Sequence, residues 1–257
     1  ARYGGYYTSH VRDEENEVLA AWAEAIAVGR QARVPVLLSH IKLASRPVWG
    51  KTAEALRLLE EANRAGVRVR ADWYPYTFWQ SSMYVLIPDR DFDNREKWKV
   101  GLDEIGGPEN VLVTSYAPTS AWEGKTVAEI AQAEGKDAVT TIIDMMHASG
   151  NSIGIIGTSM DESDLATFAA HPLTFVCSDG GLAGPHPRGY GAFPRVLATY
   201  VREQKVLDLR RAIHKMTGGP AAFLNLAGRG VLAPRHHADV AVLDPAPVQD
   251  RGTKTDP

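Results

Sequence analysis

The sequence has one cysteine and no long apolar run, and both shortages narrow the class of protein. Because Cys177 is the single cysteine among 257 residues, no disulfide can form within the chain. A reducing compartment suits that composition, so we expect a cytoplasmic protein. No stretch approaches the roughly 18 apolar residues of a membrane-spanning helix, and the first residues do not read as a signal peptide. Secretion and membrane insertion are therefore disfavoured.

The chain also lacks an excess of charge of one sign. Its 28 basic and 31 acidic residues give a formal net charge of −3, and no cluster of lysine or arginine stands out. Such a chain has no field that would attract a polyanion, so we expect neither nucleic acid nor a membrane as a partner. Hydrophobic residues make up 44% of the sequence, which is enough for a buried core.

Strand-like and helix-like segments alternate over residues 1–87. Apolar, β-prone segments end near residues 10, 40 and 74, with amphipathic helices predicted between them over 14–30 and 52–66. The spacing of about 30 residues is the length of a strand–helix–strand unit. The pattern predicts an α/β fold with a parallel sheet.

The alternation breaks over 88–171, which we interpret as an inserted subdomain. It resumes with the apolar strand 173–177 and a helix over 207–217, so 172–226 is assigned to the last strand and helix of the same sheet. Short β-prone runs between turn residues then predict a small β domain over 227–257, cut short at Pro257.

Polar residues follow three of the four predicted parallel strands. His10, His40 and Asp179 each stand at a strand end, and the loops after parallel strands form the active-site face of α/β barrels. Two imidazoles and a carboxylate suit a catalytic zinc site that activates water. For each histidine taken alone, a structural hydrogen bond is the alternative.

Further polar side chains are expected near the same face. Lys42 and Arg188 could hold a substrate carboxylate, with solvated loop charges as the alternative. Tyr74 and Tyr76 could present hydroxyl groups to a substrate or simply pack in the core. Cys177 precedes the strand end, and we expect a packed thiol rather than a nucleophile.

The remaining histidines that we considered have less suggestive positions. His147 lies near the end of a helical stretch and His171 precedes a proline, so both are expected to be structural or surface residues. His236 and His237 fall in a turn-like segment, where a solvated loop is the expected setting.

Several segments, taken in order, resemble the D-aminoacylase (N-acyl-D-amino-acid deacylase) family of the metal-dependent amidohydrolase superfamily. They are YYTSHVRDE, VPVLLSHIKLA followed by WGK, DWYPYT, SDGGLAGPHPRGYGAFPRVL and HKMTGGPAAFLNLAGRGVLAPRHHADVAVLDP. The SHIK and WGK segments, and SDG followed by HPR and FPRVL, are fairly specific to this family. The closing segment is shared across many amidohydrolases.

The resemblance implies the C-terminal half of a (β/α)8 TIM-type barrel, an inserted subdomain that covers the active site, and the start of a small β-sandwich domain. It implies zinc bound by His10 and His40, with Asp179 handling the proton of the attacking water. It also implies that Lys42 and Tyr74 contact the substrate, and Arg188 stays a substrate-binding candidate from its place in the loop after Asp179.

One departure from the family pattern bears on the chain itself. The superfamily's first-strand His-x-His motif and the family's additional cysteine ligand have no counterpart and would precede Ala1. The leading hypothesis is zinc-dependent hydrolysis of the amide bond of N-acyl-D-amino acids to a carboxylate and a free D-amino acid. The alternatives are a cyclic-amide hydrolase of the dihydropyrimidinase or dihydroorotase type, and an inactive fragment without the N-terminal metal ligands.

Overall fold

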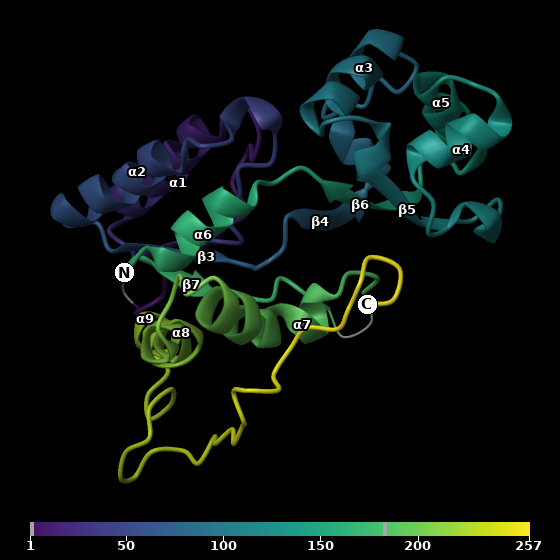
Figure 1. Ribbon diagram of the computed structural model, residues 1–257. Helices are drawn as coiled ribbons and strands as arrows, with labels where there is room; N and C mark the ends of the chain where they lie inside the picture. The colour runs from purple at the N-terminus through teal and green to yellow at the C-terminus, as the bar shows by residue number, and fades with distance from the viewer. Residues whose placement is uncertain (1–2, 182–183) are drawn as a thin grey trace.

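Two β-sheets organise the chain in the computed structural model, which describes residues 3–181 and 184–257 (Figure 1). A four-stranded sheet has the order β1-β2-β3-β7, and a three-stranded sheet has the order β4-β6-β5. The strands are β1 (Tyr7–Ser9), β2 (Val36–Leu38), β3 (Val69–Trp73), β4 (Phe78–Ser82), β5 (Val111–Tyr116), β6 (Ile153–Thr158) and β7 (Thr174–Val176).

Helices connect and cover these strands. They are α1 (Val18–Ala32), α2 (Thr52–Arg64), α3 (Arg95–Glu104), α4 (Val127–Glu134), α5 (Ala138–Ala148), α6 (Glu162–Ala170), α7 (Arg188–Arg195), α8 (Leu209–Met216) and α9 (Gly218–Phe223), with a π-helix η5 (Val196–Glu203) after α7. Among the described residues, none of the helices is both long and apolar enough to cross a membrane.

The first sheet is wholly parallel, which confirms the prediction from the strand–helix spacing. Tyr7 pairs with Val36, Val36 with Val69, and Ala71 with Thr174. Figure 1 shows β3 and β7 running between α6 on one side and α7 and α8 on the other. β7 is buried throughout, whereas β3 alternates buried apolar side chains with the partly buried Arg70 and Asp72.

Large aromatic side chains hold the helices against this sheet. Trp22 of α1 meets Phe168 of α6 with ring centroids 6.2 Å apart, and Trp73 of β3 meets Tyr200 of η5 edge-on at 5.1 Å. All four side chains are fully buried in one continuous core. Because buried aromatic rings contribute much of a core's stability, this cluster fixes the strands whose ends carry the polar residues.

The antiparallel sheet has a core of its own, in the teal part at the upper right of Figure 1. Trp98 of α3 and Ile142 of α5 are fully buried there. Helix α4 begins at a capping box, in which the Thr126 hydroxyl accepts from the Glu129 amide and the Glu129 carboxylate accepts from the Thr126 amide. A separate core is the mark of a separate structural unit.

The antiparallel sheet does not coincide with the insertion predicted over 88–171. The sheet runs from Phe78 to Thr158, and the following helix α6 contacts α2, β3 and β7. We therefore propose that the inserted subdomain spans 78–158 in place of 88–171. The sequence analysis did not predict the strand Phe78–Ser82, which lies within the residues 1–87 assigned to the strand–helix units.

The loop after β2 ties the exit of the inserted unit to the parallel sheet. The Trp49 indole donates to the carbonyl of Ser159 at 2.8 Å. The buried Asp164 carboxylate accepts from the Gly50 amide at 3.0 and 3.1 Å. These contacts fix the chain just after β6, where it returns to the parallel sheet.

Residues 227–257, where the sequence pattern predicts the start of a small β domain, form no strand in this structure. The β-prone side chains of Val240 and Val242 are exposed, the latter by 95%, and no neighbouring strand pairs with them. A β-prone run forms a strand only when it finds a partner and a buried face. Instead the segment returns past η5, where Arg202 donates to the carbonyls of Pro245 and Val248, and toward α7 (yellow in Figure 1).

Candidate metal and substrate site

The carboxyl ends of the parallel strands open into one cavity of about 510 Å³. His10 directly follows β1, His40 follows β2 by two residues, Tyr74 directly follows β3, and Asp179 follows β7 by three. Carboxyl ends of adjacent parallel strands lie at the same edge of a sheet, and the cavity is formed there. Its lining includes all six residues singled out in the sequence: His10, His40, Lys42, Tyr74, Asp179 and Arg188.

Two of these residues adopt a backbone conformation that side chains seldom accept. His40 has φ 41° and Asp179 has φ 47°, both in the left-handed region. The His40 amide donates to Asp72 Oδ1 at 2.6 Å, which holds the turn after β2 against β3. Backbone of this kind persists where the surrounding structure enforces it and is concentrated at functional sites.

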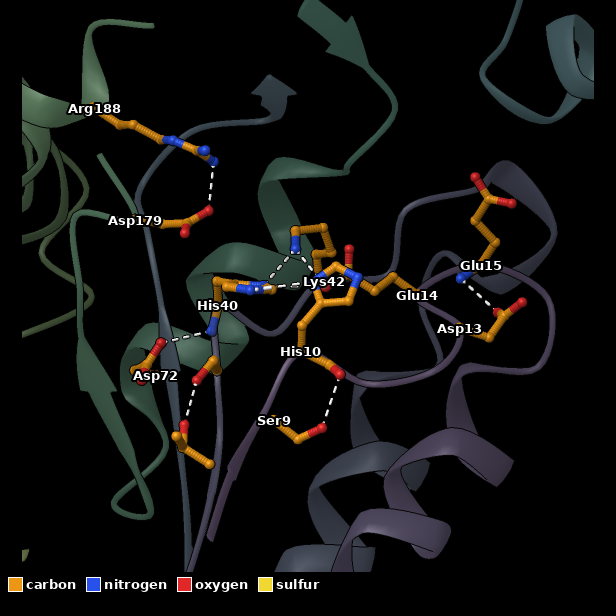
Figure 2. A network of polar contacts seen from close by, with 12 residues as sticks. Ser9, His10, Asp13, Glu14, Glu15, His40, Lys42, Asp72, Asp179 and Arg188 are labelled. Carbon is orange, nitrogen blue, oxygen red and sulfur yellow. Dashed lines mark hydrogen bonds and ion pairs between the residues drawn. The ribbon is translucent and has the colours of Figure 1, made fainter. Parts of the chain in front are cut away.

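The imidazole rings of the two histidines lie next to each other in the cavity wall. His10 Nδ1 lies 3.2 Å from His40 Nε2, and Glu14 Oε1 lies 3.6 Å from His10 Nδ1 and 3.1 Å from His40 Nδ1 (Figure 2). Tetrahedral zinc with bonds of about 2.0–2.1 Å places two ligand nitrogens about 3.3 Å apart. The observed spacing of the imidazole nitrogens therefore suits zinc. In the part of the chain that the structure describes, His10, Glu14 and His40 are the one group of three metal-binding side chains.

Glu14 is the functional candidate that the sequence analysis missed. We interpreted the acidic residues 13–15 as the first turn of a helix, but α1 begins only at Val18. The preceding residues form an irregular turn, stabilised by the Asp13 carboxylate, which accepts from the amides of Glu15 and Glu17. That turn directs Glu14 toward the histidines. A glutamate four residues after His10 was the available signal.

Lys42 completes a buried charge network with Glu14. Its Nζ donates to Glu14 Oε1 at 2.6 Å and lies 2.9 Å from His40 Nδ1. Burial raises the pKa of Glu14, but the Lys42 charge and the contacts with both histidines outweigh it and lower the pKa to about 2. Burial lowers the pKa of His10. The carboxylate is thus ionised and His10 is inclined to remain neutral, as a metal ligand must be.

Acid should destabilise the metal-free chain through Glu14. Because its pKa is depressed on folding, its stabilising contribution is complete above the usual value of 4.5 and is lost as the pH falls toward 2. We expect the stability difference between wild type and Glu14→Gln to shrink by about 2 kcal/mol on going from about pH 6 to about pH 3. Urea unfolding at both pH values measures it, with the exposed Glu61→Gln as control. A difference that is independent of pH would contradict this account.

Asp179 and Arg188 form the second half of the site, separate from the histidine group in Figure 2. Arg188 Nη1 lies 2.6 Å from Asp179 Oδ2. The ring of Tyr74 lies beneath both cations, 4.9 Å from the Arg188 guanidinium carbon and 5.6 Å from Lys42 Nζ. The Tyr74 hydroxyl is buried and has no hydrogen-bond partner among the described residues, and burial raises its pKa. It is a protonated donor available to a ligand.

Close backbone packing shapes the loop that carries Asp179. A Cβ atom on Gly180 would overlap the backbone of Gly189, and one on Gly189 would overlap the carbonyl of Gly181. The inserted unit supplies the opposite part of the cavity wall. Its contributions are Trp79, Gln80, Ser81, Tyr84, Val85, Pro88 and Arg90. Sequence reasoning anticipated a cover from this unit but could not name these residues, because only the docking of β4 brings them there.

The other polar candidates lie outside this cavity. His147 pairs with Asp93 at the surface, at 2.7 Å, and His171 lies 3.1 Å from Glu60. Burial raises the pKa of the Cys177 thiol, which hydrogen-bonds to Asp72 and is therefore not a thiolate nucleophile.

The sequence and the structure of this chain were compared with those of known proteins. A model of the amidohydrolase family matches residues 100–256. The chain is 39% identical over 255 residues to the N-acyl-D-glutamate deacylase of Alcaligenes xylosoxydans xylosoxydans, and 35% identical over 253 residues to the D-aminoacylase of the same organism. Each alignment covers 98% of this chain but 48% of the relative. The chain thus spans about half the length of the curated relatives it matches.

Solved structures of the same kinds of enzyme also match this chain, again over about half of their length. The crystal structure of N-acyl-D-glutamate deacylase from Bordetella bronchiseptica, complexed with zinc and a phosphonate mimic of the tetrahedral intermediate, matches with a TM-score of 0.83 and 34% identity. The match covers 98% of this chain and 49% of that one. A D-aminoacylase structure matches with a TM-score of 0.82 and 33% identity over 99% of this chain and 49% of that chain. Another D-aminoacylase structure is described as having a binuclear metal centre.

Proposed function

Because the chain belongs to the D-aminoacylase (N-acyl-D-amino-acid deacylase) family of the amidohydrolase superfamily, we propose that it carries part of the active site for hydrolysis of N-acyl-D-amino acids. The products are a carboxylate and a free D-amino acid. The observation that carries the proposal is that one cavity is lined by both the His10–His40 pair and the Asp179–Arg188 pair.

The proposed metal ligands in this chain are His10 and His40. Zinc held there would supply Lewis-acid polarisation of the scissile carbonyl and a more acidic water. Glu14 is the nearest carboxylate, yet its Oε1 atom is bonded to Lys42. We therefore assign Glu14 to holding Lys42 and the His40 ring in place. Further ligands, such as the family's His-x-His motif and cysteine, would lie in the part of the relatives that this chain does not match.

Asp179 is proposed as the proton carrier. Its carboxylate takes a proton from the attacking water and delivers it to the leaving nitrogen. The ion pair with Arg188 at 2.6 Å fixes the direction of that carboxylate. The left-handed turn at Asp179 places it beyond the end of β7, at the cavity wall.

The substrate carboxylate has three proposed donors. Lys42 and Arg188 are cations that both lie over the Tyr74 ring, and the Tyr74 hydroxyl is a buried donor without a partner in the described part of the chain. A bound carboxylate would satisfy that hydroxyl and be attracted by both cations. The substrate would thus be held by its amino-acid end, with its amide directed to the histidines.

For the whole fold, we propose that the parallel sheet is half of a (β/α)8 barrel and that 227–257 opens a small β-sandwich domain. The four parallel strands and the match to about half of the deacylase structures support the first proposal. The second rests on the sequence pattern alone. We retain the cytoplasm as the proposed location because the chain has a single cysteine.

A substrate panel tests the proposed reaction. We expect a zinc-loaded protein that contains this chain to release free amino acid from N-acetyl-D-amino acids and to leave the L-isomers and cyclic amides such as dihydrouracil and hydantoin intact. Amino-acid release is measured by chromatography, with the chelated protein as control. Turnover confined to cyclic amides would replace this proposal by the dihydropyrimidinase type. Hydrolysis only when the residues matched by the other half of the relatives are present would show that this chain alone is an inactive part.

A further inference from the structure

His186 is a buried histidine to which neither the metal site nor the substrate site assigns a role. It lies in the HPR segment just before α7, and 2% of its surface is exposed. Its Nε2 lies 2.8 Å from the carbonyl oxygen of Phe78, and its Nδ1 accepts from the Arg188 amide at 3.0 Å. Both ring nitrogens are therefore used, and each faces a different structural unit.

These two contacts are compatible with a single form of the ring. Nδ1 must be unprotonated to accept from an amide, and Nε2 must carry the hydrogen to donate to a carbonyl, so the imidazole is the neutral Nε2–H tautomer. Burial and the nearby cations Arg188 and Lys254 together lower the pKa of His186 to about 3, although the hydrogen bond to the Phe78 carbonyl opposes the shift. The ring is therefore neutral at neutral pH.

Aromatic neighbours fix the orientation of the ring. The Phe78 ring stacks on it with centroids 4.6 Å apart, and Tyr76 meets it edge-on at 5.2 Å. Tyr74, which lies under the Arg188 guanidinium, meets it edge-on at 6.3 Å. A ring held on its face and its edges cannot rotate to exchange its two hydrogen-bond partners without leaving the cage.

The two partners belong to the two walls of the cavity. Phe78 begins β4, and the next residues, Trp79 and Gln80, line the cavity from the inserted unit. Arg188 begins α7 and forms the ion pair with Asp179. One imidazole thus connects the strand that places the inserted wall to the helix start that places the Arg188–Asp179 pair.

We propose that His186 is a positioning residue that couples the seating of β4 to the position of Arg188 and thereby of Asp179. This proposal rests on the proposed function only in the reaction that is assigned to the Arg188–Asp179 pair. When β4 is seated, the carbonyl of Phe78 fixes the tautomer that can accept from the Arg188 amide. When β4 is displaced, the ring loses its acceptor, and the start of α7 loses the contact that holds it.

The test compares three histidine variants of the intact chain, without metal or substrate, and uses two further variants as spectral references. His186→Phe keeps an aromatic ring and removes both hydrogen bonds, whereas His186→Gln retains a donor and an acceptor on one planar group. His147→Phe is the control at an exposed histidine. Guanidinium ¹⁵N signals of Arg188, assigned by their loss in Arg188→Lys, report the ion pair, and Asp179→Asn supplies the reference position of the broken pair.

We expect the Arg188 signals of His186→Phe to move to the broken-pair position and those of His186→Gln to return toward wild type. Amide hydrogen exchange over 186–195 should accelerate about tenfold in the Phe variant, as expected for loss of a buried hydrogen bond. Unmoved Arg188 signals in a folded His186→Phe protein would overturn the proposal.

A wild-type measurement keeps the proposal testable if both variants fail to fold. Long-range ¹H–¹⁵N spectra of the imidazole should show the neutral Nε2–H tautomer, with no protonation down to about pH 5. An Nδ1–H tautomer or an imidazolium at neutral pH would also overturn the proposal. Because none of these measurements depends on hydrolysis, failure of the substrate panel would not affect the test of His186.

Discussion

In a protein that contains this chain and catalyses the proposed reaction, Asp179→Asn should lower kcat for N-acyl-D-amino acid hydrolysis by about 10²- to 10⁴-fold, the contribution typical of a positioned general base. Asparagine has nearly the same shape as aspartate but cannot accept the proton of the water. KM should change much less than kcat, since the proposed substrate contacts are Lys42, Tyr74 and Arg188. Steady-state kinetics on N-acetyl-D-glutamate and N-acetyl-D-methionine measure both constants.

Asp13→Asn is a matched control for this experiment. Asp13 lines the same cavity, but its carboxylate accepts from the amides of Glu15 and Glu17, a role that asparagine can keep. We expect kcat within about twofold of wild type, as for a substitution outside the reacting groups. If Asp179→Asn retained most of its turnover, the proton transfer would belong to another group and the mechanism would have to be abandoned.

His40→Ala should weaken zinc binding by at least about 100-fold, since changes to groups that merely orient a metal ligand already cost about 10- to 100-fold. The loss should be large because His40 is the more enclosed of the two histidines, with 15% of its side chain exposed against 66% for His10. Competition titration against a chromophoric zinc chelator gives the affinity without an assay of activity.

The exposed His147→Ala variant controls for loss of any histidine. His147 pairs with Asp93 on the surface, far along the chain from the proposed ligands. We expect its zinc affinity to match that of wild type. Equal zinc binding by His40→Ala and wild type would show that the metal is held elsewhere, even if the deacylase reaction itself were demonstrated.

The sequence was sufficient to predict the parallel sheet because strand–helix periodicity is a local property. A buried strand followed by an amphipathic helix about every 30 residues leaves few other arrangements. The same regularity placed His10, His40 and Asp179 at the ends of strands, and the structure brings all three to one cavity. Their roles remain predictions, but their proximity followed from where strands end.

What the sequence did not reveal depends on packing over long distances. Glu14 reads as a helix-capping acid until the turn stabilised by Asp13 directs it to Lys42. Phe78–Ser82 fell within the predicted strand–helix units, and only its pairing with β6 assigns it to the antiparallel sheet. His186 is unremarkable in its segment, because its function needs a carbonyl 108 residues away. None of these contacts leaves a periodic pattern in the local sequence.

Because Gly180 and Gly189 are in close contact, the part of the cavity wall that adjoins them should tolerate fewer substitutions than the rest. At both positions any side chain would collide with backbone, which cannot move aside as the end of a flexible side chain can. Laboratory evolution of substrate preference should therefore recover glycine at 180 and 189 almost without exception. The diversity that survives selection should instead accumulate over 79–90, where the inserted unit contributes side chains to the wall and the backbone of the Asp179 loop is not involved.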